Sequence, residues 1–385
     1  MSYRFSSRTG WDLGESAFAA SIRRAKAEGR ELVDLTVSNP TVCGFVYDRD
    51  AVLAPLSDPR ALTYDPDPRG MLSAREAVAS YYADHGVPVS PAALVLTTST
   101  SEAYGYLFRL LCDAGDEVLV AQPSYPLFDF LADLEDVRLR PYPLFYDYGW
   151  WIDFAELERR IAPRTRAIVL VHPNNPTGHA TGREERARLE EICRRHGLAL
   201  IVDEVFLDYA FGDEPLESFA CGPHPVLTFV LSGMSKIAGL PQMKVGWIAA
   251  FGPGAERDAA LARLEVIADT FLSMNAPAQL ALPSWLQNRF HIQQQIMERT
   301  TANLNAISAN GLHALRAEAG WSAVIRLPRI GVTAEGLLED DAVVVHPGSF
   351  YGMSEPERVV VSLIVTLEAF ALGMEPIRSA CGRFA

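Results

Sequence analysis

The amino-acid sequence predicts an α/β fold: a large domain around a seven-stranded, mostly parallel sheet and a smaller α+β domain formed by both chain ends. From about residue 94 onward, short runs of β-branched and other aliphatic residues alternate with helical segments. These runs are apolar almost throughout, which is typical of parallel strands covered on both faces. The chain has 385 residues, 49% of them hydrophobic and 21% charged, enough for two or three domains.

The elements of the first two thirds follow in chain order. Residues 16–28 and 72–85 have the spacing of amphipathic helices, and the turn-rich segment 38–41 lies between them. Further helices are predicted over 101–112 and over 183–196, where Arg and Glu recur at i, i+4 spacing. The seven predicted strands of the large domain are 94–98, 117–121, 137–142, 167–171, 198–202, 226–231 and 244–251.

The last third of the chain changes character. Residues 256–310 contain few helix breakers and predict long helices, whereas residues 321–377 return to α+β character. We therefore expect an N-terminal arm and part of the small domain over 1–50, a large domain over 51–280 and a C-terminal small domain over 281–385. The strands of the small domain are predicted near 322–327, 342–346 and 359–365.

Charge and cysteine content disfavour several classes of protein. The 34 Lys and Arg against 48 Asp and Glu give a net charge of −14, which disfavours a nucleic-acid partner. The five cysteines are scattered without C-x-x-C spacing, so we expect neither a metal site nor a disulfide framework. The N-terminus lacks the apolar segment of a secretory signal, and no run is long enough to cross a membrane; we expect a cytoplasmic protein without a membrane partner.

Four polar segments follow apolar strands, and the carboxyl ends of strands are where α/β sheets place ligands. Lys236 lies in a Ser/Gly turn after the strand at 226–231, and a desolvated lysine there can form a Schiff base with a carbonyl. Asp203 follows the strand at 198–202 and can pair with a cationic ligand nitrogen. The plainer interpretations are a solvated loop lysine and a helix cap or structural ion pair.

The other two segments are a turn and a helix start. Asn175, within Asn-Asn-Pro-Thr-Gly, offers a donor and an acceptor, although an ordinary Pro/Gly turn is the plainer interpretation. Ser99, Thr100 and Ser101 open a helix, where hydroxyls and free N–H groups form an anion site; simple N-capping is the alternative. A Schiff-base lysine, an acid for a ring nitrogen, an amide for a ring oxygen and a phosphate cup are together what pyridoxal 5′-phosphate requires.

The order and spacing of these segments resemble those of the class I/II aminotransferases, the fold-type I pyridoxal-phosphate enzymes, from about residue 30 to 365. The resemblance implies that Lys236 forms the Schiff base and moves the substrate proton, and that Asp203 keeps the pyridine nitrogen protonated. It also implies a homodimer with shared active sites, in which Tyr64 reaches the phosphate of the neighbouring subunit. Tyr125 is expected to stack on the ring. The other implied cofactor-binding residues are Ser99, Thr100, Ser101, Asn175, Ser235 and Lys244.

Three positions depart from the family pattern. Phe206 stands where the family commonly has a tyrosine that donates to the cofactor 3′-oxygen; that hydrogen bond is worth ~1.5–3 kcal/mol, so we expect a raised Schiff-base pKa. Lys244 replaces an arginine and keeps the charge without the bidentate fork. If Ser362 is the family serine, Val360 stands where an arginine clamps the substrate carboxylate.

Candidates for the missing clamp lie nearby. Arg358 is two residues before Val360 on the same strand face, displaced by roughly 6.6–6.8 Å, although a surface arginine at a strand start is the plainer interpretation. Arg326, inside another strand, is the second candidate, and Ser38 is a third substrate-binding candidate. His346 is expected to be a loop contact, because Lys236 already fills the role of base.

The sequence thus predicts a pyridoxal-phosphate-dependent aminotransferase that acts on an amino acid and a 2-oxo acid by a ping-pong mechanism. A pyridoxal-phosphate lyase of the β-elimination type shares every cofactor residue and stays open as an alternative. A non-catalytic sensor module is disfavoured, because such modules usually follow a basic DNA-binding domain and the resemblance begins near residue 30. The sequence does not identify the amino donor or acceptor.

Overall fold

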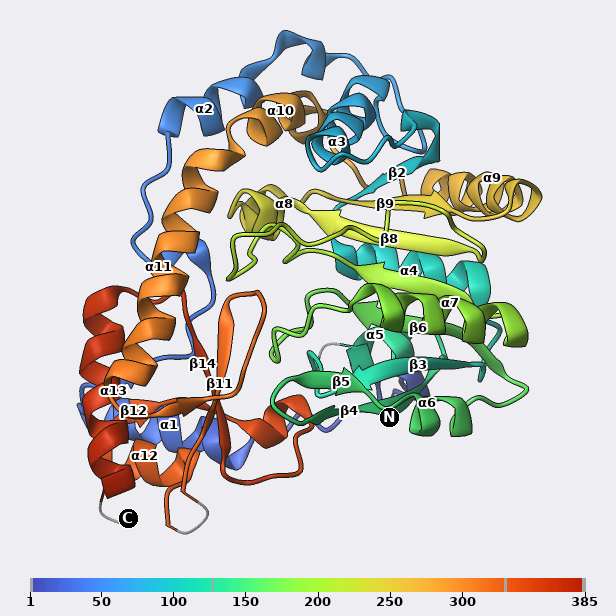
Figure 1. Cartoon of the computed structure of the whole chain (residues 1–385). Coiled ribbons are helices and arrows are strands. Elements are labelled where there is room, and N and C mark those ends of the chain that lie inside the picture. The colour runs from blue at the N-terminus through green and yellow to red at the C-terminus, as the bar shows by residue number, and fades with distance from the viewer. Residues whose placement is uncertain (1–2, 127, 329–330, 383–385) are drawn as a thin grey trace.

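The computed structural model describes residues 3–126, 128–328 and 331–382. A layered α/β domain holds the middle of the chain, and a smaller domain contains helices from both chain ends (Figure 1). These two helices are α1 (Ala17–Ala27) and α13 (Leu367–Gly382). The predicted division into a large α/β part and a smaller α+β part drawn from both ends is therefore confirmed.

The large domain is built around an eight-stranded sheet in the order β2-β9-β8-β7-β6-β3-β4-β5. Its central strands run parallel, whereas β9 is antiparallel to both of its neighbours and β5 is antiparallel to β4. The strands are β2 (Leu94–Thr97), β3 (Glu117–Gln122), β4 (Arg138–Tyr146), β5 (Trp150–Ile152), β6 (Thr165–Val171), β7 (Ala199–Asp203), β8 (Thr228–Gly233) and β9 (Gly246–Phe251).

The predicted number of seven strands is one too few. All seven predicted strands are present, and the eighth is β5, a three-residue strand that pairs back on the end of β4. Such a short segment has no readable period, so its assignment depends on the tertiary pairing with β4 and not on a local pattern.

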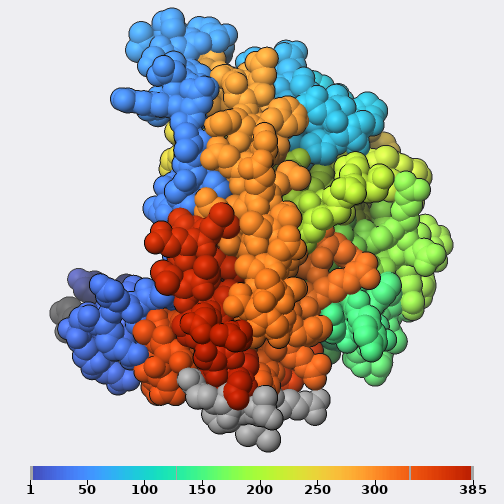
Figure 2. All heavy atoms as spheres, turned by 60° about the vertical axis from the view of Figure 1, so that its left-hand side comes forward, coloured from blue at the N-terminus to red at the C-terminus, as the bar shows by residue number. Residues whose placement is uncertain are grey.

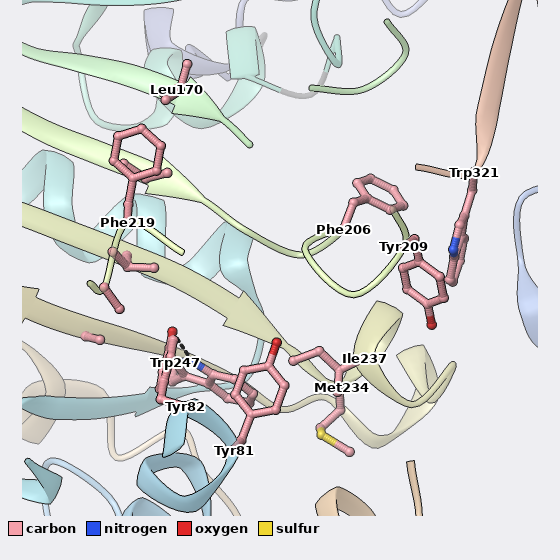
Figure 3. Packing of buried hydrophobic residues seen from close by; sticks show 14 of the residues in the cluster. Tyr81, Tyr82, Leu170, Phe206, Tyr209, Phe219, Met234, Ile237, Trp247 and Trp321 are labelled. Carbon is pink, nitrogen blue, oxygen red and sulfur yellow. Dashed lines mark hydrogen bonds between the residues drawn. The ribbon is translucent and has the colours of Figure 1, made fainter. Parts of the chain in front are cut away.

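Helices cover both faces of this sheet, which explains why its strands are apolar throughout. In β7, Ala199 and Ile201 pack in one core cluster with α4 and α9, while Leu200 and Val202 pack in another with α3, α7 and α10. In that second cluster, the Nε1 of Trp247 donates to the Tyr82 hydroxyl at 3.1 Å (Figure 3). The helices of this domain are α2 (Arg49–Leu53), α3 (Leu72–Asp84), α4 (Thr100–Leu111), α5 (Phe128–Leu134), α6 (Phe154–Arg159), α7 (Arg183–His196), α8 (Met234–Ile237), α9 (Gly254–Phe271) and α10 (Ala276–Gln287).

The small domain contains an antiparallel sheet in the order β10-β11-β14-β13 and a separate parallel pair, β1 and β12. The β1–β12 pair joins an early segment to a late one. Besides α1 and α13, the elements of the small domain are β1 (Val33–Asp34), β10 (His313–Ala314), β11 (Ser322–Arg326), α12 (Ala334–Asp341), β12 (Val343–Val344), β13 (His346–Pro347) and β14 (Arg358–Ser362). The domain boundaries at residues 50 and 280 stay predictions.

A single long helix, α11 (Arg289–Ala309), connects the two domains. Figure 2 shows its atoms, in orange, running lengthwise along one face of the molecule, beside the red atoms of α13. Near its start, Gln293 Nε2 donates to the carbonyl of Ile237 in α8, and near its end Asn303 Nδ2 donates to the carbonyl of Leu363 after β14. The same helix therefore contacts elements of both domains that border the site described below. None of the described helices combines the length and apolar character that a membrane span requires.

Candidate active site

A cavity of about 350 Å³ lies between the two domains, at the carboxyl ends of β2, β6, β7 and β8. This is the edge where parallel sheets place ligands, and the volume falls in the range of small-molecule sites. The sequence-predicted residues that line it are Ser38, Ser99, Thr100, Ser101, Tyr125, Asn175, Asp203, Ser235, Lys236 and Lys244. The structure therefore brings nine of the ten predicted cofactor residues to one place.

Lys236 lies on the short helix α8, directly after β8. Its backbone carbonyl accepts a hydrogen bond from the Tyr209 hydroxyl (2.6 Å), which holds the turn. Its Nζ lies 4.8 Å from the ring centre of Trp321 and 5.5 Å from that of Phe206; these rings lie close together in Figure 3. Burial lowers the pKa of Lys236 to about 8, while the charge of Asp203 acts in the opposite direction. A fraction of this amine is therefore unprotonated and nucleophilic near neutral pH.

Asp203 ends β7 and is only 7% exposed. Its Oδ1 accepts from the backbone N–H of Val205 (3.1 Å), and its Oδ2 accepts from the hydroxyl of Tyr104 on α4 (3.2 Å). Burial raises the pKa of Asp203 to about 6, and the two hydrogen bonds and Lys236 limit that rise. The carboxyl group is thus mostly ionised at pH 7 in a dry site, where it can hold a cationic N–H group strongly.

The predicted phosphate cup forms where α4 begins. Ser99 caps the helix by accepting from the N–H of Glu102 (3.2 Å). A Cβ on Gly246, in the neighbouring strand β9, would lie 2.9 Å from the carbonyl carbon of Ser99. Gly246 also pairs with Gly233 at the end of β8. Glycines at these two positions let three backbone segments approach closely, so the helix start and the lysine turn line the same cavity.

Asn175 follows β6, and its Oδ1 accepts from the hydroxyl of Ser322 on β11 (3.3 Å). Among the described residues, its Nδ2 has no hydrogen-bond partner and is free to donate to a ligand. With Lys236, Asp203 and the cup, the cavity presents an amine, a carboxylate, an amide donor and an anion site. This donor set fits pyridoxal 5′-phosphate, and the half-exposed ring of Tyr125 lies on the same cavity wall.

The loop that carries Asn175 is locked onto the small domain. Gly178 has a φ of +69°, and a Cβ there would lie 2.5 Å from both the Ala317 Cβ and the Ala319 carbonyl oxygen, in the connection between β10 and β11. Buried His179 lies with its Nε2 3.0 Å from Glu185 and its Nδ1 3.7 Å from Glu318. Burial alone lowers the pKa of His179, but the two glutamates outweigh it and raise the pKa to about 9.

The remaining predicted residues lie elsewhere. Tyr64 is 83% exposed and borders a separate surface hollow of about 100 Å³. Neither Arg358 nor Arg326 lines the cavity: Arg358 pairs with Glu355 (2.8 Å) and lies over the ring of Trp150 (5.3 Å). Arg326 is exposed and directly opposite Arg358 in the β11–β14 ladder. The cavity wall holds Val360 instead, with Ser362 beside it.

Several lining residues were not predicted as site residues from the sequence, and three of them matter most for the chemistry. Tyr104 follows the phosphate-cup segment, but only the packing of α4 against β7 shows that it reaches Asp203. Trp321 precedes β11, and nothing in the sequence relates it to Lys236. His346, expected to be a loop contact, lies on β13 opposite Val360 and lines the cavity.

Comparison with known proteins agrees with this geometry. The chain is 30% identical over 266 residues to a glutamate-pyruvate aminotransferase AlaA of Escherichia coli (strain K12), and 32% identical over 282 residues to an alanine aminotransferase of Mycobacterium tuberculosis (strain ATCC 25618 / H37Rv). These matches cover 69% and 71% of this chain. They cover 65% and 64% of the relatives, so they span slightly less than two thirds of the relatives' length.

The fold is also that of solved aminotransferases. An alanine aminotransferase from Pyrococcus furiosus superposes with a TM-score of 0.88 at 20% identity, covering 99% of this chain and 100% of that one. The model of the family described as aminotransferase class I and II matches residues 32–369. The chain therefore belongs to the class I and II aminotransferases.

Proposed function

We propose that this chain is a pyridoxal-phosphate-dependent aminotransferase that moves an amino group between an amino acid and a 2-oxo acid in two half-reactions. The observation that carries the proposal is the placement of Lys236, with its lowered pKa, and ionised Asp203 in one cavity beside the phosphate cup. Membership of the family supports the same assignment.

The large-domain wall of the cavity would hold the cofactor at four points. The start of α4, with Ser99, Thr100 and Ser101, takes the phosphate, with Ser235 and Lys244 supplying a hydroxyl and a positive charge. The amide of Asn175 donates to the ring oxygen, and Tyr125 covers one face of the ring. Asp203 keeps a proton on the ring nitrogen, and when bound the cofactor supplies an electron sink for the substrate Cα.

Lys236 supplies both the attachment point and the base. Its Nζ accepts the proton from the substrate Cα and holds it within the cavity until the proton is returned. The rings of Trp321 and Phe206 exclude water around the amine, which is the physical reason for its lowered pKa. The backbone that carries this base is fixed by Tyr209, whose hydroxyl donates to the Lys236 carbonyl.

The proposal is tested by following the visible absorbance of the cofactor-loaded protein. Each of the twenty amino acids is added in turn, and at least one should remove this absorbance and appear as its 2-oxo acid; a second 2-oxo acid should then restore it. Release of ammonia together with a 2-oxo acid, without any acceptor, would instead identify the lyase alternative.

We further propose a cytoplasmic homodimer in which each Tyr64 serves the site of the other chain. The exposure of Tyr64 in the single chain supports this role, because its ring and hydroxyl are accessible to a second chain. Mixing Lys236→Ala protein with Tyr64→Ala protein should rebuild one complete site in each mixed dimer. Activity no higher than the sum of the two inactive stocks would reject the shared site.

A further inference from the structure

The small-domain wall of the cavity carries an imidazole beside the position where the family pattern has an arginine. His346 on β13 is the direct cross-strand partner of Val360 on β14. Cβ atoms of such partners lie roughly 4.5–5.5 Å apart and on the same face of the sheet. Both residues line the cavity, and Val360 is only 1% exposed. The larger, polar side chain of His346 is therefore the one that reaches the space left by the short Val360.

The ring of His346 is held in place by two other rings. It stacks on Phe350 with ring centres 4.8 Å apart and planes 4° apart, and Tyr351 meets it edge-on at 5.7 Å. Among the described residues, neither imidazole nitrogen has a hydrogen-bond partner. An oriented, half-buried polar ring without a partner of its own is prepared to bind a ligand.

Hydroxyl groups complete this wall. Ser362 lies two residues after Val360 on the same strand face, and Thr36, Ser38 and Ser322 also line the cavity. Among the described lining residues the lysine and arginine side chains are Lys236 and Lys244 alone, which are assigned above to the substrate proton and the phosphate. A carboxylate entering this end of the cavity needs a donor, because an unpaired buried charge is strongly disfavoured.

We propose that His346 binds the carboxylate of the amino acid and of the 2-oxo acid, in place of an arginine clamp, with the hydroxyls of Ser362 and Ser38 as further donors. This inference rests on the proposed function, since it names the substrate contact of the same site. His346 is assigned to substrate binding alone, and the base remains Lys236.

The charges around His346 predict how binding depends on pH. Burial lowers the pKa of His346, whereas Asp34 on β1 acts in the opposite direction. Asp203, Lys236 and Lys244 line the same cavity, and Tyr351 contacts the ring. A bound carboxylate stabilises the protonated imidazole, so binding takes up a proton near neutral pH and weakens as pH rises. A neutral imidazole keeps one N–H donor, so binding weakens to a plateau and is not abolished.

The test uses two substitutions of different chemistry. His346→Phe keeps the ring stack with Phe350 and removes the donor, whereas His346→Gln keeps a donor and removes the charge. The probes are the fastest donor among the twenty amino acids and the α-carboxamide of the same amino acid, which lacks the negative charge. Kinetics are measured from pH 6 to 9, together with the dissociation constant and absorbance spectrum of the cofactor.

For His346→Phe, KM for the amino acid should rise by ~10–100-fold, as expected for a lost hydrogen bond to a charged group. KM for the carboxamide and the cofactor dissociation constant should stay within ~2-fold of the wild type. For His346→Gln, KM for the amino acid should rise less than for His346→Phe. The increase of KM with pH that protonation of His346 causes in the wild type should be absent. The double variant His346→Phe, Val360→Arg should regain amino-acid affinity, which mere loss of packing would not allow.

Two results would overturn the assignment. One is an unchanged KM for the amino acid in a folded, cofactor-loaded His346→Phe protein; the other is an equal rise of KM for the amino acid and its carboxamide. A failure of the proposed function is distinguishable, because then no amino acid alters the cofactor absorbance of the wild-type protein.

Discussion

The two walls of the cavity are built differently. On the large-domain wall the polar groups are tied to one another: Asp203 accepts from Tyr104 and Val205, and the carbonyl of Lys236 accepts from Tyr209. On the small-domain wall, His346 is held by ring packing and Val360 by its strand. The large-domain wall is suited to hold one cofactor in a fixed position. On the small-domain wall, we expect single substitutions to change which substrate is bound.

The largest effect of a substitution on the large-domain wall is expected at Lys236. Lys236→Ala should lower turnover by roughly 10²-fold or more, because the positioned base for the substrate Cα is gone. Borohydride treatment of the wild-type holoenzyme should attach the cofactor to Lys236, which peptide mass spectrometry would locate. An adduct on Lys244, the other lysine of the cavity, would show that the large-domain wall has been assigned wrongly.

The next largest effect is expected at Asp203. Asp203→Ala should reduce turnover by about 10²-fold and also weaken cofactor binding, because a charge-assisted hydrogen bond to the ring nitrogen disappears. Spectroscopic titration with the cofactor measures the affinity, and steady-state kinetics the turnover. A variant with unchanged turnover would mean that another acid serves the ring.

A smaller loss of turnover is expected at Tyr104, whose hydroxyl belongs to the hydrogen bonds of the large-domain wall. Tyr104→Phe removes one donor to Asp203, so the pKa of that carboxyl should rise further and turnover should fall by ~10-fold. Tyr106→Phe is the matched control, because its hydroxyl lies on the same helix and interacts with Ser273, at 3.4 Å, and with Glu102 instead of Asp203. Equal behaviour of the two variants in kinetics and cofactor titration would show that the Tyr104 hydrogen bond has no role in the site.

The contact that joins the two walls should be sensitive to alkaline pH. The folded state raises the pKa of His179, so the stability that it contributes is complete below its unfolded pKa of about 6.5 and is lost as pH rises through about 9. We expect a loss on the order of 1–3 kcal/mol in the free energy of unfolding across this window. Urea unfolding of the wild type and of His179→Gln measures it; the variant should show a flatter profile, and parallel profiles would contradict the assignment.

The smallest effect is expected at Arg358. Its guanidinium already pairs with Glu355 and lies over Trp150, outside the cavity lining. Arg358→Ala should therefore leave KM for the amino donor within ~2-fold of the wild type. A tenfold rise would restore the arginine clamp that the sequence predicts and would remove the need for His346.

How much the sequence predicts also differs between the walls. Each large-domain group stands at the end of an apolar run, so local pattern was enough to place Asp203 and Lys236 at one edge of the sheet. On the small-domain wall, the neighbour of Val360 depends on strand register, which no local pattern encodes. The sequence therefore predicts only a loop contact for His346 and not its place beside Val360. Arg358 was predicted by its reach along the strand, but Glu355, three residues earlier, takes up its charge.

The absence of a side chain at Gly178 has a consequence for the spacing of the two cavity walls. Substituting lining residues alters the shape of the pocket while the distance between its walls stays the same. Gly178 lies outside the lining, where the loop of Asn175 and the β10–β11 connection meet without room for a side chain. A larger residue there would push the Asn175 loop and this connection apart, at a φ of +69° that favours glycine. The packing of the two walls thus depends on a residue outside the cavity lining as well as on the residues within it.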